Sequence, residues 1–70
     1  MEAKVYEQEH ATIYGHNVWH YLIDTPIGQI HVVDYEAQRE IKRIIIDADN
    51  QKAEKTFKRI CHQMTDGKFL

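Results

Sequence analysis

The sequence has little of the residues that would give a small protein extra stability or a recognisable chemistry. Cys61 is the only cysteine, so no disulfide forms within the chain. There is one proline and no serine, and the three glycines form no phosphate-binding loop. No apolar run approaches the roughly 20 residues that cross a bilayer, and we expect no secretory leader. We therefore expect one soluble domain covering residues 1–70, in the cytoplasm, where an unpaired cysteine is ordinary.

The sequence has no large excess of positive or negative charge. Nine Lys and Arg face eleven Asp and Glu, which gives a formal net charge of −2 with neutral histidines. This balance argues against a protein that binds nucleic acid through bulk positive charge, and it is too small for a mimic of DNA phosphates. A single core in a chain this short rarely supplies more than about 3–5 kcal/mol, so small domains often add an oligomeric or other partner.

Hydrophobic patterning predicts an α+β fold, a small four-stranded antiparallel meander sheet with one C-terminal helix packed on one face. The expected strands cover about 4–14, 17–24, 29–35 and 40–47, and the expected helix covers about 50–65. Asp49 or Asn50 is suited to cap the start of the helix, and Asp66-Gly67 to end it. One apolar stripe follows helical spacing and is made of Ala53, Phe57, Ile60, Cys61 and Met64.

The stretch Thr25-Pro26-Ile27-Gly28 predicts a three-residue hairpin loop with a bulge, in which Thr25 faces Gln29. In this register one face of the hairpin carries Trp19, Tyr21, Ile23, His31, Val33 and Tyr35. The other face carries Val18, Leu22, Ile30 and Val32 with His20, Asp24 and Asp34. In the first strand, alternation puts Val5, Ala11 and Ile13 on one side.

Both faces of the predicted sheet are therefore apolar, and the strand at 40–47 repeats the pattern with Ile41 and Ile45 on one side and Ile44 and Ile46 on the other. Sheets with two apolar faces are normally covered on both. A helix of about 15 residues is roughly 22 Å long and covers one face only. We expect a second copy or another protein on the other face. If the helix instead lies on Trp19 and Tyr21, the exposed patch becomes Val18, Leu22, Ile30 and Val32.

Five histidines raise the question of a metal site, since His16 and His20 share a strand face and the predicted register sets Asp34 across from His20. Their spacing is not that of a zinc site, and His20 beside Asp34 is better explained as a polar cross-strand pair. Cys61 and His62 are adjacent in a helix, so their side chains point about 100° apart and do not form a nucleophile and base. We expect no metal, no cofactor and no enzymatic activity.

The outer side of the helix offers the strongest competing site. Lys52, Lys55, Arg59 and His62 recur at helical spacing opposite the apolar stripe, and Lys58 flanks them. Such a stripe is suited to binding phosphates, although it is also typical of the solvated side of any helix packed on a sheet.

The sequence thus favours a small non-enzymatic protein-binding module that binds its partner through the aromatic sheet face. We also expect it to form a homodimer. Aromatic residues clustered on a surface are enriched at protein interfaces. An inhibitor or adaptor of the kind that phages and mobile elements encode fits this size. The alternative is a nucleic-acid-binding module that uses the basic side of the helix.

Overall fold

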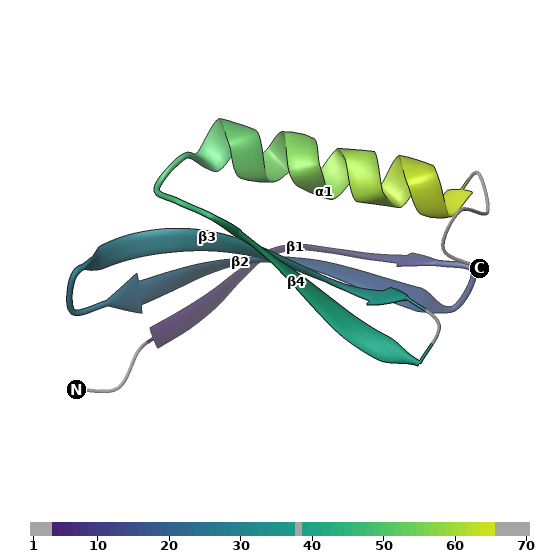
Figure 1. The fold of residues 1–70 in the computed structure, drawn as a ribbon, viewed down its shortest axis with the longest axis horizontal. Helices are drawn as coiled ribbons and strands as arrows, with labels where there is room; N and C mark the ends of the chain where they lie inside the picture. The colour runs from purple at the N-terminus through teal and green to yellow at the C-terminus, as the bar shows by residue number, and fades with distance from the viewer. Residues whose placement is uncertain (1–3, 38, 66–70) are drawn as a thin grey trace.

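The computed structural model describes residues 4–37 and 39–65, which form a four-stranded sheet and one helix (Figure 1). The strands are β1 (Lys4–Ile13), β2 (His16–Thr25), β3 (Gly28–Ala37) and β4 (Glu40–Ile46), followed by α1 (Asn50–Thr65). All neighbouring strands are antiparallel and lie in the order β1-β2-β3-β4. The predicted α+β meander with a C-terminal helix on one face is confirmed.

The helix begins where the sequence indicates. The Asp49 carboxylate accepts a hydrogen bond from the backbone N–H of Lys52 at 3.0 Å, so Asp49 is the N-cap and Asn50 is the first residue of α1. The Asp49 carbonyl also accepts from the N–H of Ala53 at 3.2 Å. The predicted stop at Asp66-Gly67 lies outside the described residues.

The predicted register of the central hairpin is wrong by one residue. Thr25 pairs with Gly28 rather than with Gln29, so the loop contains only Pro26 and Ile27. The Thr25 hydroxyl donates to the Gly28 carbonyl at 2.6 Å, and Gln29 Nε2 donates to Asp24 Oδ1 at 2.7 Å across the next pair. These bonds fix the shorter loop. Because side chains alternate along a strand, the slip moves all of β3 to the opposite face from the one predicted.

Two local features also change the prediction for β1. The turn to β2 is a two-residue loop in which Tyr14 (φ 50°) and Gly15 (φ 80°) both adopt positive φ, as a type I′ hairpin requires, so β2 begins at His16. A β-bulge between Glu7 and Glu9 then inserts one extra residue. The bulge separates Val5 from Ala11 and Ile13, which the simple alternation had placed together.

The core lies between α1 and the face of the sheet that carries Val18 and Val33. These two valines are fully buried against the helix stripe, where Ile60 is 1% exposed and Met64 and Phe57 are also buried. Ala11, Ile13, Tyr35, Ile44 and Cys61 pack around this cluster. Figure 1 shows α1 along one side of the twisted sheet and no helix or strand of the described chain on the other. Which face the helix covers, left open by the sequence, is thus the Val18 face.

A pair of buried histidines lies on this helix-covered face. His20 Nε2 and His31 Nδ1 are 2.9 Å apart, and the two side chains are 1% and 7% exposed. His20 Nδ1 is buried without a hydrogen-bond partner. The expected pairing of His20 with Asp34 is wrong, because the register sets Val33 opposite His20 and Asp34 opposite Trp19 on the other face.

The burial of His20 makes the stability of the fold depend on pH. Burial and the neighbouring His31 lower the pKa of His20 below its ordinary value of 6.5, although Glu9 on β1 and Glu54 on α1 act in the opposite direction. An unfolded His20 therefore binds a proton more readily than the folded one, so the contribution is intact above about pH 6.5 and is lost as the pH falls below it. We expect the urea midpoint to fall between pH 7.5 and pH 5.5.

The matched control is His20→Gln, measured by urea unfolding at the same two pH values. A glutamine at position 20 does not titrate, so the fall in midpoint between pH 7.5 and pH 5.5 should be smaller in this variant than in the unmodified chain. An equal fall in both proteins would contradict the assignment of the pH dependence to His20.

Candidate protein-binding face

The face of the sheet opposite α1, here called the open face, is defined by strand register, since residues paired across strands share a face. Its central row runs across all four strands as His10, Trp19, Asp34 and Arg43. The next row runs from Glu7 through Tyr21 and Val32 to Ile45. Beyond that row Val5 pairs with Ile23 and Ile23 with Ile30. No described element of the chain lies over these rows.

Three stacked rings form a ladder along this face. The Trp19 indole lies 5.6 Å from the His10 ring with an interplanar angle of 6°, and 6.5 Å from the Tyr21 ring at 15°. Trp19 and Tyr21 are partly exposed. Offset stacking of this kind holds the rings in place, so the chain already fixes Trp19 in one orientation before anything binds it.

An ion pair borders the rings. Arg43 donates from Nε and Nη2 to the two carboxylate oxygens of Asp34 at 2.7 and 2.8 Å. The Asp34 side chain is 10% exposed and that of Arg43 53% exposed. The hydrogen bond to Asp34 raises the pKa of Arg43, and burial, with help from Glu7 and Asp34, raises the pKa of the Tyr21 hydroxyl. Both groups therefore keep their protons at neutral pH.

A second polar group lies at the Thr12 end of the face. Asn17 Oδ1 lies 2.8 Å from His10 Nε2 and accepts from the Thr12 hydroxyl at 3.0 Å, while Asn17 Nδ2 donates to Glu36. This network ties β1, β2 and β3 together through side chains. The rings of His10, Trp19 and Tyr21 are thus bordered by satisfied polar groups across the strands, at Asp34 and Arg43, and along them, at Asn17. Polar groups at the border of an apolar centre are typical of protein interfaces.

Aliphatic side chains extend the apolar area toward the other end of the face and over β4. Val32, which pairs with Tyr21 across β2 and β3, is 1% exposed, whereas Ile23 and Ile30 are partly exposed. Val5, Ile41 and Ile45 are 58%, 65% and 66% exposed. Scattered exposed aliphatics are normal, but apolar side chains gathered on one sheet face with aromatic rings mark an interaction surface.

The residues predicted to bind a partner are divided between the two faces of the sheet. Trp19, Tyr21 and Ile23 lie together on the open face, as predicted. His31, Val33 and Tyr35 lie on the helix-covered face, where His31 and Val33 are buried and Tyr35 packs against the core. This grouping was wrong because of the one-residue register slip.

Sequence reasoning missed the open-face residues His10, Asn17 and Arg43, and it placed Ile30, Val32 and Asp34 away from Trp19. Their contacts depend on which residues of neighbouring strands are paired. The only signal available in the sequence was the length of the Thr25–Gly28 loop, and a loop one residue shorter would have brought Ile30, Val32 and Asp34 beside Trp19.

The basic residues of the alternative site are all exposed on α1. Lys52, Lys55, Lys58, Arg59 and His62 point away from the core, which receives Ala53, Phe57, Ile60 and Met64. They are therefore on the opposite side of the molecule from Trp19. Cys61 packs against the core, and burial raises the pKa of its thiol, so it behaves as a small apolar side chain there.

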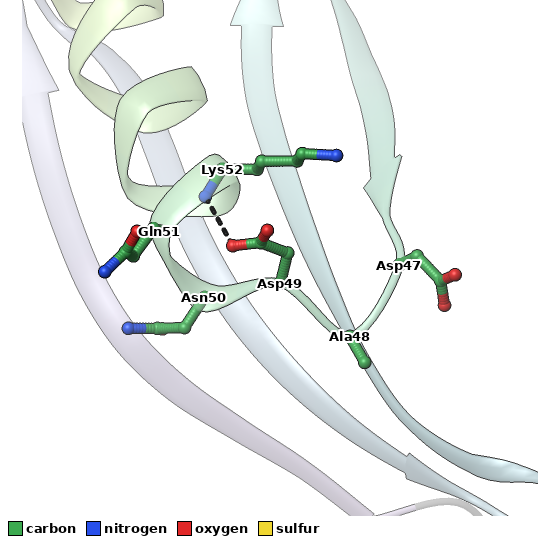
Figure 2. A pocket seen from close by; sticks show the side chains of 6 residues that line it. All are labelled: Asp47, Ala48, Asp49, Asn50, Gln51 and Lys52. Atoms are coloured by element: carbon green, nitrogen blue, oxygen red, sulfur yellow. Dashed lines mark hydrogen bonds between the residues drawn. The ribbon is translucent and has the colours of Figure 1, made fainter.

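A shallow hollow lies at the start of α1 (Figure 2) and is lined by Asp47, Ala48, Asp49, Asn50, Gln51 and Lys52. The Lys52 N–H donates to Asp49 within this hollow, so helix capping explains the Asp49 carboxylate. Within residues 4–37 and 39–65, no three His, Cys, Asp or Glu side chains lie close enough to share a metal ion. None of the described helical structure has the length and apolar character to span a membrane.

Comparison of the chain with protein-family models, curated proteins and solved structures found no match.

Proposed function

We propose that this protein is a small non-enzymatic protein-binding module of the cytoplasm, of the inhibitor or adaptor type, which binds another protein through its open face. The observation that carries this proposal is the stacked ladder of His10, Trp19 and Tyr21 on a sheet face that no described element covers. Trp and Tyr are the residues most enriched among interface hot spots.

Preorganisation supports the same proposal. Ordering a free side chain at an interface costs about 0.5–1.5 kcal/mol, and stacking has already ordered Trp19 in the unbound protein. The aliphatic residues Ile23 and Ile30 widen the apolar centre, and the Asp34–Arg43 pair supplies a bordering hydrogen-bonding group. A partner with an apolar strip flanked by an acidic group would match both parts of this surface.

The experiment that tests this function places a photo-crosslinking amino acid at position 23, on the open face but outside the ring ladder. A second protein carries the same group at Lys55 on α1. We expect a protein adduct from position 23 whose identified partner, once purified, binds the unmodified chain and binds the Trp19→Ala chain much more weakly. A purified partner that binds both chains equally would defeat the proposal.

A second candidate function, nucleic-acid binding, is favoured by the exposure of every predicted basic residue on the outer side of α1. Against it, the net charge is −2, and the rings of His10, Trp19 and Tyr21 are on the other side of the sheet, so within residues 4–37 and 39–65 no aromatic stacking platform accompanies the cations. Filter binding with single- and double-stranded oligonucleotides tests it. Nucleic-acid binding would be established instead if the double variant Lys55→Glu with Arg59→Glu no longer bound the oligonucleotides and Trp19→Ala bound them unchanged.

A further inference from the structure

The outer edge of β4 is a second surface that the described chain leaves unpartnered. β4 is the last strand in the sheet order, and α1 packs mainly on β1, β2 and β3. Most of β4 is exposed, including two of its four isoleucines, Ile41 and Ile45, which lie on the open face. Natural sheets usually protect such an apolar edge strand, because its free backbone groups pair readily with another strand.

The backbone of β4 presents hydrogen-bonding groups at this edge. The His31 N–H points toward the β4 side and donates at 3.4 Å to the carbonyl of Asp47, the residue directly after β4. Because backbone groups alternate in direction along a strand, Val33 and Tyr35 also bond toward β4, through their partners Ile44 and Lys42. The intervening residues Ile41, Arg43 and Ile45 therefore turn their N–H and C=O groups outward.

The edge is also complementary to itself. Residues 43–47 read Arg-Ile-Ile-Ile-Asp, with the basic residue at one end and the acidic residue at the other. When two copies run antiparallel about Ile45, Ile45 lies opposite its own copy and Ile44 opposite the partner's Ile46. Arg43 then lies opposite the partner's Asp47. This register gives three isoleucine pairs between two opposite-charge pairs, each favourable across strands.

Two competing registers are less favourable: centring on Ile41 gives opposite-charge pairs but joins only residues 40–42, because β4 begins at Glu40. Centring the two strands on Arg43 sets like charges directly opposite each other, which is destabilising. Asp34 on β3 binds Nε and Nη2 of Arg43, so Nη1 is the guanidinium nitrogen that takes no part in those two bonds.

We propose that β4 pairs antiparallel with β4 of a second copy of this chain, centred on Ile45. The two sheets become one continuous sheet, and the two-fold axis passes through it at right angles. Both helices then lie on one side and both Trp19 ladders on the other, so the dimer presents a doubled open face. This pairing uses the strand edge and stands whether or not the open face binds a protein.

The first test is sedimentation equilibrium of the unmodified chain, the Asp47→Arg variant and the Glu40→Arg control. We expect the unmodified chain to sediment with twice its chain mass, and Asp47→Arg, which sets Arg against Arg43, to sediment as a monomer with an unchanged circular dichroism spectrum. Glu40→Arg is a like change on the same strand beyond the paired segment, so it should remain dimeric. A monomeric unmodified chain, a dimeric Asp47→Arg or a monomeric Glu40→Arg would each overturn the proposal.

A second test needs no charge change. In a hydrogen-bonded antiparallel pair the Cα atoms are about 5.5 Å apart, within the range of a disulfide. In a Cys61→Ala background, Ile45→Cys should therefore give a covalent dimer under mild oxidation. The control is Ile41→Cys, equally exposed on the same strand, whose copy would lie about 27 Å away at about 3.4 Å per residue. Equal or reversed yields of crosslinked dimer would refute the register.

Discussion

Replacing Trp19 with alanine is expected to weaken binding of the protein partner by about 30-fold or more while the chain stays folded. A loss of this size corresponds to the roughly 2 kcal/mol or more that defines a hot spot. Trp19 occupies the middle of the open face, between His10 and Tyr21, and it is only partly buried by its own chain. Its removal therefore deletes contact area with the partner without opening a cavity in the core.

Calorimetric titration with the partner identified by crosslinking measures this effect. The control is Tyr14→Ala, which also deletes an exposed aromatic side chain, in this case 67% exposed in the turn between β1 and β2 and outside the ring ladder. Binding to the Tyr14→Ala chain should stay within about threefold of the unmodified value, since most interface-remote truncations cost little. Similar losses in both variants would show that exposed aromatic area in general, rather than the Trp19 ladder, carries the binding.

Replacing Ile60 with alanine is expected to leave a large fraction of the protein molecules unfolded. Ile60 is 1% exposed in the cluster between α1 and the sheet, and truncating a buried isoleucine costs about 2–5 kcal/mol. A core of this size supplies only about 3–5 kcal/mol in total. The cost of this one cavity is thus comparable to the whole free energy of unfolding.

Ile41→Ala is the matched control, because it makes the same chemical change at a side chain 65% exposed on the open face. Its free energy of unfolding should stay within about 0.5 kcal/mol of the unmodified value, as for other surface substitutions. Urea unfolding followed by circular dichroism measures both variants. Equal destabilisation by the two substitutions would mean that the open face is covered in the folded protein, contrary to the structure.

The sequence alone was enough to predict which segments are strands and which is the helix. Local signals carried those predictions: Asp49 at the N-cap, the stripe from Ala53 to Met64, and apolar β-branched runs between turn residues. It was also enough to predict that Trp19, Tyr21 and Ile23 share a face, because that follows from alternation within one strand.

Register could not be predicted in the same way, because it depends on small energy differences between turns. Pro26 fits a two-residue and a three-residue loop alike, and the bond from the Thr25 hydroxyl to Gly28 that accompanies the shorter loop is visible only in three dimensions. Each one-residue error then exchanges the faces of a whole strand. His31, Val33 and Tyr35 were misplaced for this reason, and the buried contact between His20 and His31 was missed with them.

The bulge in β1 is a second feature that alternation cannot reveal. It inserts one residue between Glu7 and Glu9. This stretch is polar, so no apolar side chain there indicates that the alternation between the two faces is interrupted. The ends of the strand therefore follow opposite alternations, and Val5 joins the open face while Ala11 packs on the core.

Trp19 is the only tryptophan in the chain, so its fluorescence reports the open face directly. The decisive measurement is acrylamide quenching of that emission for the chain alone and for its complex with a tryptophan-free form of the crosslinked partner. We expect efficient quenching in the free chain, and a blue-shifted emission protected from acrylamide in the complex. An emission that is equally accessible to acrylamide in both states would contradict the assignment of the open face as the protein-binding surface.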